Sequence, residues 1–326
     1  MGNKTTTNIG VDVSFLNDKF SLSLDGFKDR TSDILMTPVV PDTYGMSAPI
    51  MNVGVVDNIG WEAMFSYRDQ KNDFRWGVTL QVSDAKNKVK EMIGSPVISG
   101  NYITEVGHEM NEWYGWKCEG IFASDEEVKN HAFQNIKTGI GDLKYQDTDE
   151  NETVNANDRV RLGSSRPRFP FGINLDFGWK GIDLNIFLQG VASQKTYINS
   201  YGGLPLPESL GSLQEHHMDR WHQDDNGSWI AGKYPKLRIG GINVGSFSSF
   251  WLQNSAYLRA KNIQIGYTLP EGFVKKLSME RIRFYLNAEN LFTFTKMKGV
   301  DPESPVGNGN MYPLTKVCSF GVNVSF

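Results

Sequence analysis

The sequence lacks the long apolar stretch that a membrane-spanning helix needs. Such a helix holds roughly 20 consecutive, mainly apolar residues, and no run in the chain approaches that length, while the mean hydropathy is −0.39. A low mean hydropathy does not exclude membrane strands. Strands of a membrane barrel need only about 9 to 11 residues each and alternate lipid-facing apolar with lumen-facing polar positions.

The sequence also lacks a net positive charge, and it has few cysteines and prolines. The formal net charge of −4 gives no basic face for nucleic acid, so we expect no nucleic-acid partner. The two cysteines, Cys118 and Cys318, lie too far apart for a zinc spacing or a disulfide framework. Only 13 prolines stand beside 33 glycines and 12% aromatic residues, a balance that favours strands and tight turns over a helical bundle.

Apolar residues recur at every second position in several segments of barrel-strand length. From Phe169 to Lys180 the odd positions are apolar or aromatic and the even positions are mostly polar or glycine. The same alternation begins at Ile9, at Trp61, at Ile182 and at Ile282. Period-two patterns separated by turn residues predict antiparallel hairpins, and we count about nine strands.

The predicted connections alternate strictly between short and long. The short ones cover residues 17–19, 70–73, 180–181 and 270–280, and the long ones cover 31–54, 88–167, 192–255 and 296–316. Outer-membrane barrels have short periplasmic turns and long extracellular loops. With the final residue, Phe326, at the periplasmic end, all four short connections become periplasmic.

Aromatic residues gather near the ends of the strands that the short connections join. Such rings favour the membrane interface, and the predicted girdle consists of Phe15, Phe20, Tyr67, Phe74, Trp76, Trp179, Tyr267 and Phe326. We therefore expect an all-β, antiparallel transmembrane β-barrel segment with long extracellular loops. A soluble sandwich or soluble barrel is the alternative, because its strands also alternate.

Several motifs, taken in order, resemble the SusC/RagA class of TonB-dependent outer-membrane transporters over nearly the whole chain. They are residues 141–145 (GDLKY), the acidic loop 147–158, Leu162-Gly163, Arg166-Pro167, residues 179–184 (WKGIDL), Gln189-Gly190, residues 256–270 (AYLRAKNIQIGYTLP), residues 290–293 (NLFT) and residues 301–303 (DPE). The resemblance implies import of bulky nutrients, typically oligosaccharides or peptides, across the cell outer membrane. It also implies TonB and a SusD-like surface lipoprotein as partners, with outer-membrane lipid around the barrel.

The resemblance further implies that residues 1–326 are the C-terminal part of a larger barrel of about 22 strands. No signal peptide is found at residues 1–7, and the plug domain, the TonB-contacting segment and the earlier strands of the family are not found either. We expect an isolated set of strands with two open edges neither to transport nor to fold stably.

The acidic loop has the oxygen spacing of an EF-hand calcium site. Its candidate ligands are Asp147, Asp149, Asn151, Thr153, Asn155 and Asp158, since oxygen donors at alternate positions can converge on one hard cation. Glu152 replaces the usual glycine of the sixth position, and Asp158 replaces the usual bidentate glutamate of the twelfth. Both changes should weaken binding, and a solvated acidic turn is the alternative. No cofactor is required by the expected function, and calcium is the single candidate.

Aromatic side chains in the expected loops could contact a substrate or a partner. The candidates are Trp113, Trp116, Trp221 and Trp229, and rings of this kind stack on sugars but also anchor loops onto one another. We favour the packing role.

The carboxyl end resembles the terminal signal that the barrel-assembly machinery reads, a final aromatic preceded by apolar residues at alternate positions. Here these residues are Phe320, Val322, Val324 and Phe326. Any closing strand can alternate in this way.

Catalysis has little support in the sequence, and we expect no enzyme and no catalytic residue. His216, His217 and His222 lie near aspartates but lack the helical HExxH spacing of a zinc site. Two other functions stay open beside nutrient import: a passive porin-type barrel, and a soluble surface protein that binds glycans.

Overall fold

One large antiparallel sheet dominates the structure. The computed structural model describes residues 2–37, 43, 45, 49–199, 204–205, 213–238, 241–303, 312 and 314–326. Nine long strands lie in the order β1, β2, β3, β4, β11, β12, β17, β18, β20, which confirms the predicted number and pairing. They are β1 (Asn3–Phe15), β2 (Phe20–Met36), β3 (Met51–Lys71), β4 (Phe74–Glu91), β11 (Arg168–Trp179), β12 (Ile182–Ser193), β17 (Tyr257–Thr268), β18 (Arg281–Glu289) and β20 (Val317–Ser325).

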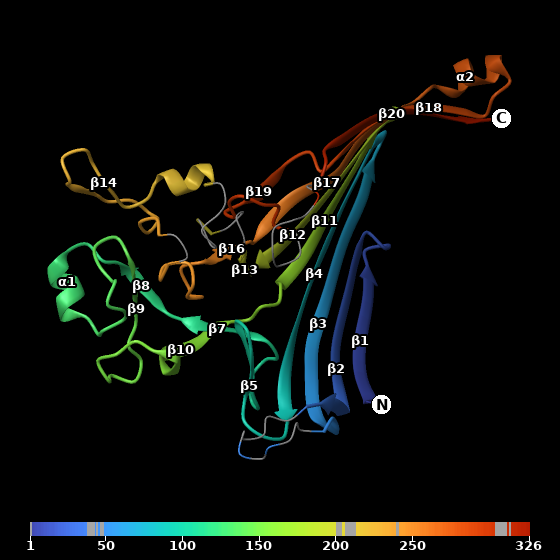
Figure 1. Cartoon of the computed structure of the whole chain (residues 1–326). Coiled ribbons are helices and arrows are strands. Elements are labelled where there is room, and N and C mark those ends of the chain that lie inside the picture. The colour runs from blue at the N-terminus through green and yellow to red at the C-terminus, as the bar shows by residue number, and fades with distance from the viewer. Residues whose placement is uncertain are drawn as a thin grey trace.

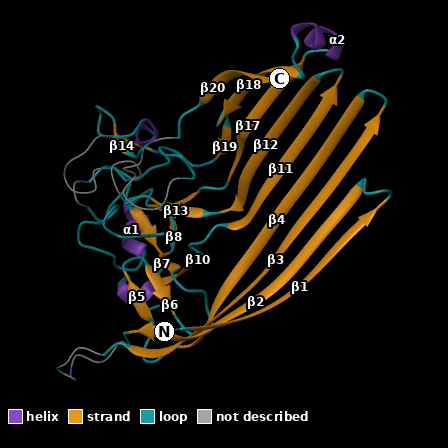
Figure 2. Ribbon diagram, turned by 90° about the vertical axis from the view of Figure 1, so that its right-hand side faces the viewer, coloured by secondary structure: helices purple, strands orange, loops and turns teal. Residues whose placement is uncertain are grey.

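Neighbouring strands are joined by short turns at one end of the sheet and by long segments at the other (Figures 1 and 2). The turns after β1, β3 and β11 contain residues with positive φ, among them Asn17, Asn72 and Lys180, the backbone region that asparagine and tight hairpins tolerate best. Strands β2 to β4 run further toward the loop end than the alternation predicted, because they continue past the apolar segment into charged residues.

The sheet carries its apolar side chains outward, as the alternation predicted. Cross-strand pairs such as Leu80 with Ile173 and Ile265 with Leu286 stand on one face, and Leu80, Ile265 and Leu286 expose between 42% and 57% of their surface. A soluble protein of this size rarely leaves such a continuous apolar face in water. The face suits contact with lipid.

Aromatic rings form a continuous row on that face at the short-turn end. Phe15 stacks on Phe20 at 5.0 Å, Phe20 contacts Tyr67 at 4.4 Å, and Tyr67 contacts Trp76 at 4.5 Å between ring centroids. This arrangement confirms that the predicted girdle residues of the first four strands share one level and one face.

The long segments between strands fold into a separate cap beside the loop end of the sheet (Figure 1). Its four-stranded sheet has the order β10, β7, β6, β5. The cap strands are β5 (Val97–Ser99), β6 (Tyr102–Thr104), β7 (Glu112–Trp116), β8 (Cys118–Ile121), β9 (Leu143–Tyr145), β10 (Arg159–Gly163), β13 (Lys195–Tyr197), β14 (His222–Gln223), β15 (Trp229–Ile230) and β16 (Leu252–Asn254), and the short strand β19 (Thr293–Thr295) pairs with β17.

Helices are few and short. Helix α1 (Asp125–Asn130) lies in the cap, with the Ser124 side chain accepting a hydrogen bond from the Glu127 amide at its start, and α2 (Glu271–Val274) lies in the connection between β17 and β18. Within the described residues no helix is both long and apolar enough to cross a membrane.

A hydrophobic core holds the cap together. Trp113 is completely buried and contacts the rings of Tyr102, Phe247 and Tyr197. These residues come from two different loops, 92–167 and 194–256, so the core joins the loops to each other. The cap is thus a packed unit that the strand pattern alone did not reveal.

Candidate functional site

The inner face of the sheet is polar and hydrogen-bonded. A hollow of about 930 Å³ lies near the short-turn end, and its walls carry cations and carboxylates including Arg75, Asp176, Asp183 and Arg283. The Arg283 Nε donates to Asp183 at 3.0 Å, and the Asn185 side chain donates to Asp176 at 2.7 Å. Paired charges of this kind suit a water-filled or plugged lumen.

A buried arginine joins two motifs that the sequence places more than forty residues apart. Arg259 on β17 is 1% exposed, and its guanidinium donates to Asp301 at 2.6 Å, to Glu303 at 3.1 Å and to the Thr293 hydroxyl at 2.8 Å. Lys261 donates to Glu303 at 2.8 Å. The network fixes the start of the last long loop against the loop end of β17, and sequence analysis did not connect these residues.

A second buried charge, Asp142, fixes the cap. It is fully buried and accepts hydrogen bonds from Arg238 at 2.8 Å and from the Asn243 side chain at 2.9 Å, with Lys236 at 3.2 Å. Burial lowers the pKa of Lys236, and the Asp142 carboxylate opposes this effect. Gly141 before it has a φ of 81° and would bring a Cβ within 3.1 Å of Trp221, which explains the glycine of the GDLKY motif.

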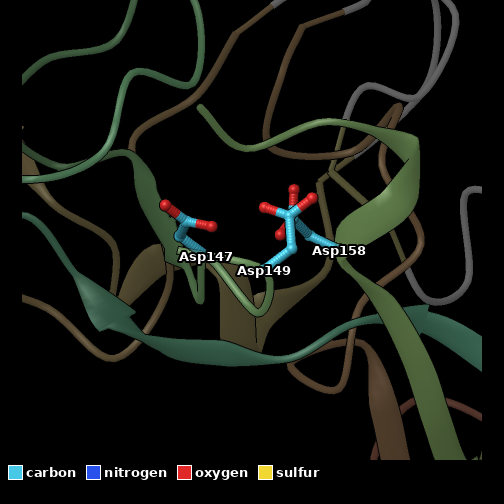
Figure 3. Close-up of side chains that lie close together, drawn as sticks. All are labelled: Asp147, Asp149 and Asp158. Atoms are coloured by element: carbon cyan, nitrogen blue, oxygen red, sulfur yellow. The ribbon is translucent and has the colours of Figure 1, made fainter. Parts of the chain in front are cut away.

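Three carboxylates of the acidic loop converge. One side-chain oxygen of each of Asp147, Asp149 and Asp158 lies within 4.8 Å of the other two (Figure 3). Asp158 is fully buried and accepts from the Thr148 and Asn155 amides, both at 2.7 Å. One oxygen of Asp147 is buried without a hydrogen-bond partner. An oxygen in that position is a suitable ligand for a hard cation.

The other three predicted ligands are used differently. Asn151 and Asn155 turn their side-chain oxygens to the amides of Thr153 and Asn157, at 2.9 Å and 2.8 Å, and the Thr153 carbonyl accepts from Asn155. The structure thus brings together three of the six predicted ligands, the carboxylates, and ligation by Asn151, Thr153 and Asn155 stays a prediction. The backbone still follows the EF-hand pattern in one respect: Glu152, at the sixth position, has a φ of 63°, where glycine is usual.

The carboxylates of the acidic loop influence one another. Loss of hydration together with the negative charge of Asp158 raises the pKa of Asp149. Burial opposes ionisation of Asp158, but hydrogen bonds from the Asn155 and Thr148 amides outweigh it and lower that pKa. Asp149 thus stabilises the loop when protonated and loses that contribution as the pH rises through its raised pKa. A bound cation would neutralise this excess of negative charge.

The four loop tryptophans serve mainly in packing. Trp113 is completely buried, which corrects its candidacy as a substrate or partner contact. Trp116 is half-buried and donates to the Asn155 carbonyl at 2.8 Å. Trp221 and Trp229 are also half-buried, and Lys236 lies 5.3 Å from the Trp229 ring. The structure does not bring the four rings together into one binding surface.

The terminal apolar residues share the outer face of the edge strand β20. Phe320, Val322 and Val324 pair with Leu286, Phe284 and Ile282 of β18, and Phe326 follows them, 83% exposed. Their role as an assembly signal stays a prediction.

An antiparallel sheet with an apolar outer face, a polar inner face, short turns at one end and a folded loop cap at the other defines a wall segment of a membrane β-barrel. Residues 5–291 match the family model described as TonB dependent receptor-like, beta-barrel. The chain therefore belongs to the TonB-dependent receptor β-barrel family.

Known relatives extend over almost the whole chain. TonB-dependent receptor P3 of Formosa agariphila is 27% identical over 98% of this chain and 33% of its own length. TonB-dependent receptor SusC of Bacteroides thetaiotaomicron is 22% identical over 99% of this chain and 32% of its own length. The chain thus spans about a third of the length of these relatives.

A solved structure shares the fold. The structure of the RagAB peptide transporter matches with a TM-score of 0.79 and 22% identity, over 100% of this chain and 35% of that chain. The likeness confirms that the nine strands have the arrangement of a barrel wall.

Proposed function

We propose that this chain forms part of the wall, lumen lining and extracellular cap of a TonB-dependent nutrient importer in the cell outer membrane. The observation that carries the proposal is the sidedness of the sheet, apolar outside and charged inside, in a chain of this receptor family. Among the strands that the structure describes, the outermost ones, β1 and β20, each pair with one neighbour, so further strands would close the barrel.

The proposed cargo is an oligosaccharide or a peptide. A hollow of about 930 Å³ lined by both signs of charge suits a bulky polar solute, and the solved relative is described as a peptide importer. A SusD-like surface lipoprotein would act at the cap, and TonB would act through a plug in the lumen. Dependence of uptake on energy from TonB would distinguish this importer from a passive porin.

Uptake in intact cells tests the proposal. Cells with and without the gene are given labelled peptides or labelled oligosaccharides, with and without a protonophore. We expect uptake of one class to depend on both the gene and the proton gradient. Gene-dependent uptake that persists with the protonophore would instead identify a porin.

We propose in addition that the acidic loop binds one Ca²⁺ through Asp147, Asp149 and Asp158. The support is the convergence of three carboxylates, the buried and unpartnered oxygen of Asp147, and the left-handed backbone at Glu152. The ion would tie the loop to Asp158, which already fixes the backbone of residues 148 and 155.

The substitution Glu152→Gly should strengthen both the loop and its affinity for the cation. A non-glycine residue in the left-handed region costs about 1 kcal/mol, so we expect about fivefold tighter terbium binding, measured by luminescence sensitised by nearby tryptophan. Glu150 has a similar φ of 57° outside the carboxylate cluster. Glu150→Gly is the matched control, because it relieves a similar backbone strain and should change terbium binding less than Glu152→Gly does. Asp158→Asn removes one of the three carboxylates and should abolish terbium binding.

A further inference from the structure

The outer face of two strands, β2 and β4, changes from apolar to basic toward their loop ends. On β2 the outward positions Leu22 and Leu24 are followed by Lys28 and Arg30, and on β4 Leu80 and Val82 are followed by Lys86 and Lys88. The register keeps these cations on the same face as Trp61, because Lys28 and Lys86 are both cross-strand partners of Ile59.

Three basic side chains of this outward face surround a buried carboxylate. Asp57 is 2% exposed, and Lys28, Lys90 and Arg30 approach it at 3.6, 3.9 and 4.0 Å. A bulge in β4 turns Lys90 toward it. Six cations, namely Lys28, Arg30, Lys86, Lys88, Lys90 and Arg168, therefore face three carboxylates, Asp57, Asp84 and Glu91, and the patch carries surplus positive charge.

Lys86 and Lys88 have the greatest freedom to bind a ligand. Both are exposed, and neither forms an ion pair with any residue that the structure describes. The acidic residues beside them are already paired: Arg168 holds Asp84, with Nε at 2.6 Å, and lies 3.7 Å from Glu109.

A hollow of about 650 Å³ lies against these two lysines. Ile59 and Trp61 supply apolar surface in it. Its charged lining consists of the cations Lys86, Lys88 and Arg168 and the carboxylates Asp57, Asp84, Glu109 and Glu112. Ile59 and Trp61 are 55% and 42% exposed. The four carboxylates already have cationic neighbours: Arg168 beside Asp84 and Glu109, Arg161 beside Glu112, and Lys28 beside Asp57. Lys86 and Lys88 therefore remain for an anionic group, and Ile59 and Trp61 for an apolar one.

The patch lies at the level where lipid headgroups begin. Lys86 follows the girdle residue Trp76 by ten residues on β4. At about 3.3 Å per residue and a tilt of about 40°, that distance rises about 25 Å along the barrel axis. The apolar band of such barrels is also about 25 Å tall.

We propose that this outward basic patch binds the phosphate groups of an anionic outer-leaflet lipid, with Lys86 and Lys88 as the main phosphate contacts and Ile59 and Trp61 against its acyl region. The proposal rests on the membrane placement given under the proposed function. It adds a lipid site on the outer wall, separate from the lumen and the cap.

The test uses the protein extracted from outer membranes, placed in phosphatidylcholine nanodiscs that contain fluorescent lipid A. We expect Lys86→Gln with Lys88→Gln to weaken binding about 10- to 30-fold, since each basic residue near an anionic surface contributes a factor of about five. Lys275→Gln with Lys276→Gln is the control, because these lysines lie at the short-turn end. Dephosphorylated lipid A should bind as weakly to the natural protein as phosphorylated lipid A binds to the variant.

Three results would count against the lipid site. Unchanged binding in the Lys86 and Lys88 variant, equal binding of dephosphorylated lipid A, or complete competition by millimolar inorganic phosphate would each overturn it. The natural protein is also tested for heat-modifiable migration on a gel. A protein that migrates alike with and without heating contradicts the membrane barrel itself, whereas normal heat modification with unchanged lipid binding contradicts the lipid site alone.

Discussion

Replacement of Arg259 by methionine should release the start of the last long loop from the sheet. The guanidinium is 1% exposed and neutralises Asp301 and Glu303, which are 20% and 16% exposed. Removing one partner of a buried ion pair costs about 3 to 5 kcal/mol, because the opposite charge is left without its partner. Here Asp301 loses its cation, and Glu303 keeps only Lys261, at 2.8 Å. Hydrogen exchange of the Thr293 and Thr295 amides should therefore accelerate by at least about a hundredfold.

Two comparisons make the Arg259 result specific. Lys275→Met removes the exposed ion pair with Glu271, at 3.0 Å, and should cost no more than about 0.5 kcal/mol. Adding Asp301→Asn and Glu303→Gln to Arg259→Met should restore much of the protection, because the two carboxylates that the guanidinium neutralised are then uncharged. Lys261, which loses Glu303, is 26% exposed and reaches solvent. If the triple variant exchanges as fast as the single one, the network does not act through charge.

The Arg259 network also shows what the sequence could not supply. Residues 256–270 and residues 301–303 stood out as separate motifs, but side-chain periodicity describes neighbours within one strand. An alternation with a period of two does not predict which distant carboxylates contact a given arginine. The position of Arg259 near the end of a predicted strand was a usable signal, since an arginine that becomes buried there requires partners.

Replacement of Trp113 by alanine should unfold the cap while leaving the sheet intact. Trp113 is completely buried and contacts rings from β6 and from the loop 194–256. Truncating a buried tryptophan costs about 3 to 5 kcal/mol, enough to expose the cap to cleavage by a protease in solution. Limited proteolysis should cut between residues 92 and 167, while strands β11 and β12 stay protected in the membrane.

Trp229→Ala is the matched control for this substitution. Trp229 is only half-buried and has Lys236 5.3 Å from its ring, so its loss should cost about 1 kcal/mol and leave the cleavage pattern unchanged. Equal proteolysis of the two variants would show that the Trp113 cluster does not hold the cap.

Sequence patterns predicted the sheet well and the cap poorly, and the reason is physical. Strands between lipid and water must alternate, so segments such as Phe169 to Lys180 carry their own orientation. Loop residues pack against partners far away in the chain, so Trp113 could be marked as an aromatic but not as the centre of a core. The acidic loop falls between these cases. Its carboxylates were found by their spacing, whereas the hydrogen bonds that engage Asn151 and Asn155 depend on the folded turn.

An intact mass measurement shows whether this chain is a wall segment of a larger outer-membrane importer. The polypeptide that carries this sequence is isolated from detergent-solubilised outer membranes and weighed by mass spectrometry. Since the chain covers 33% of the length of one relative, we expect a mass about three times the 36.6 kDa of these 326 residues. A stable outer-membrane protein of 36.6 kDa would show instead that the barrel consists of this chain alone.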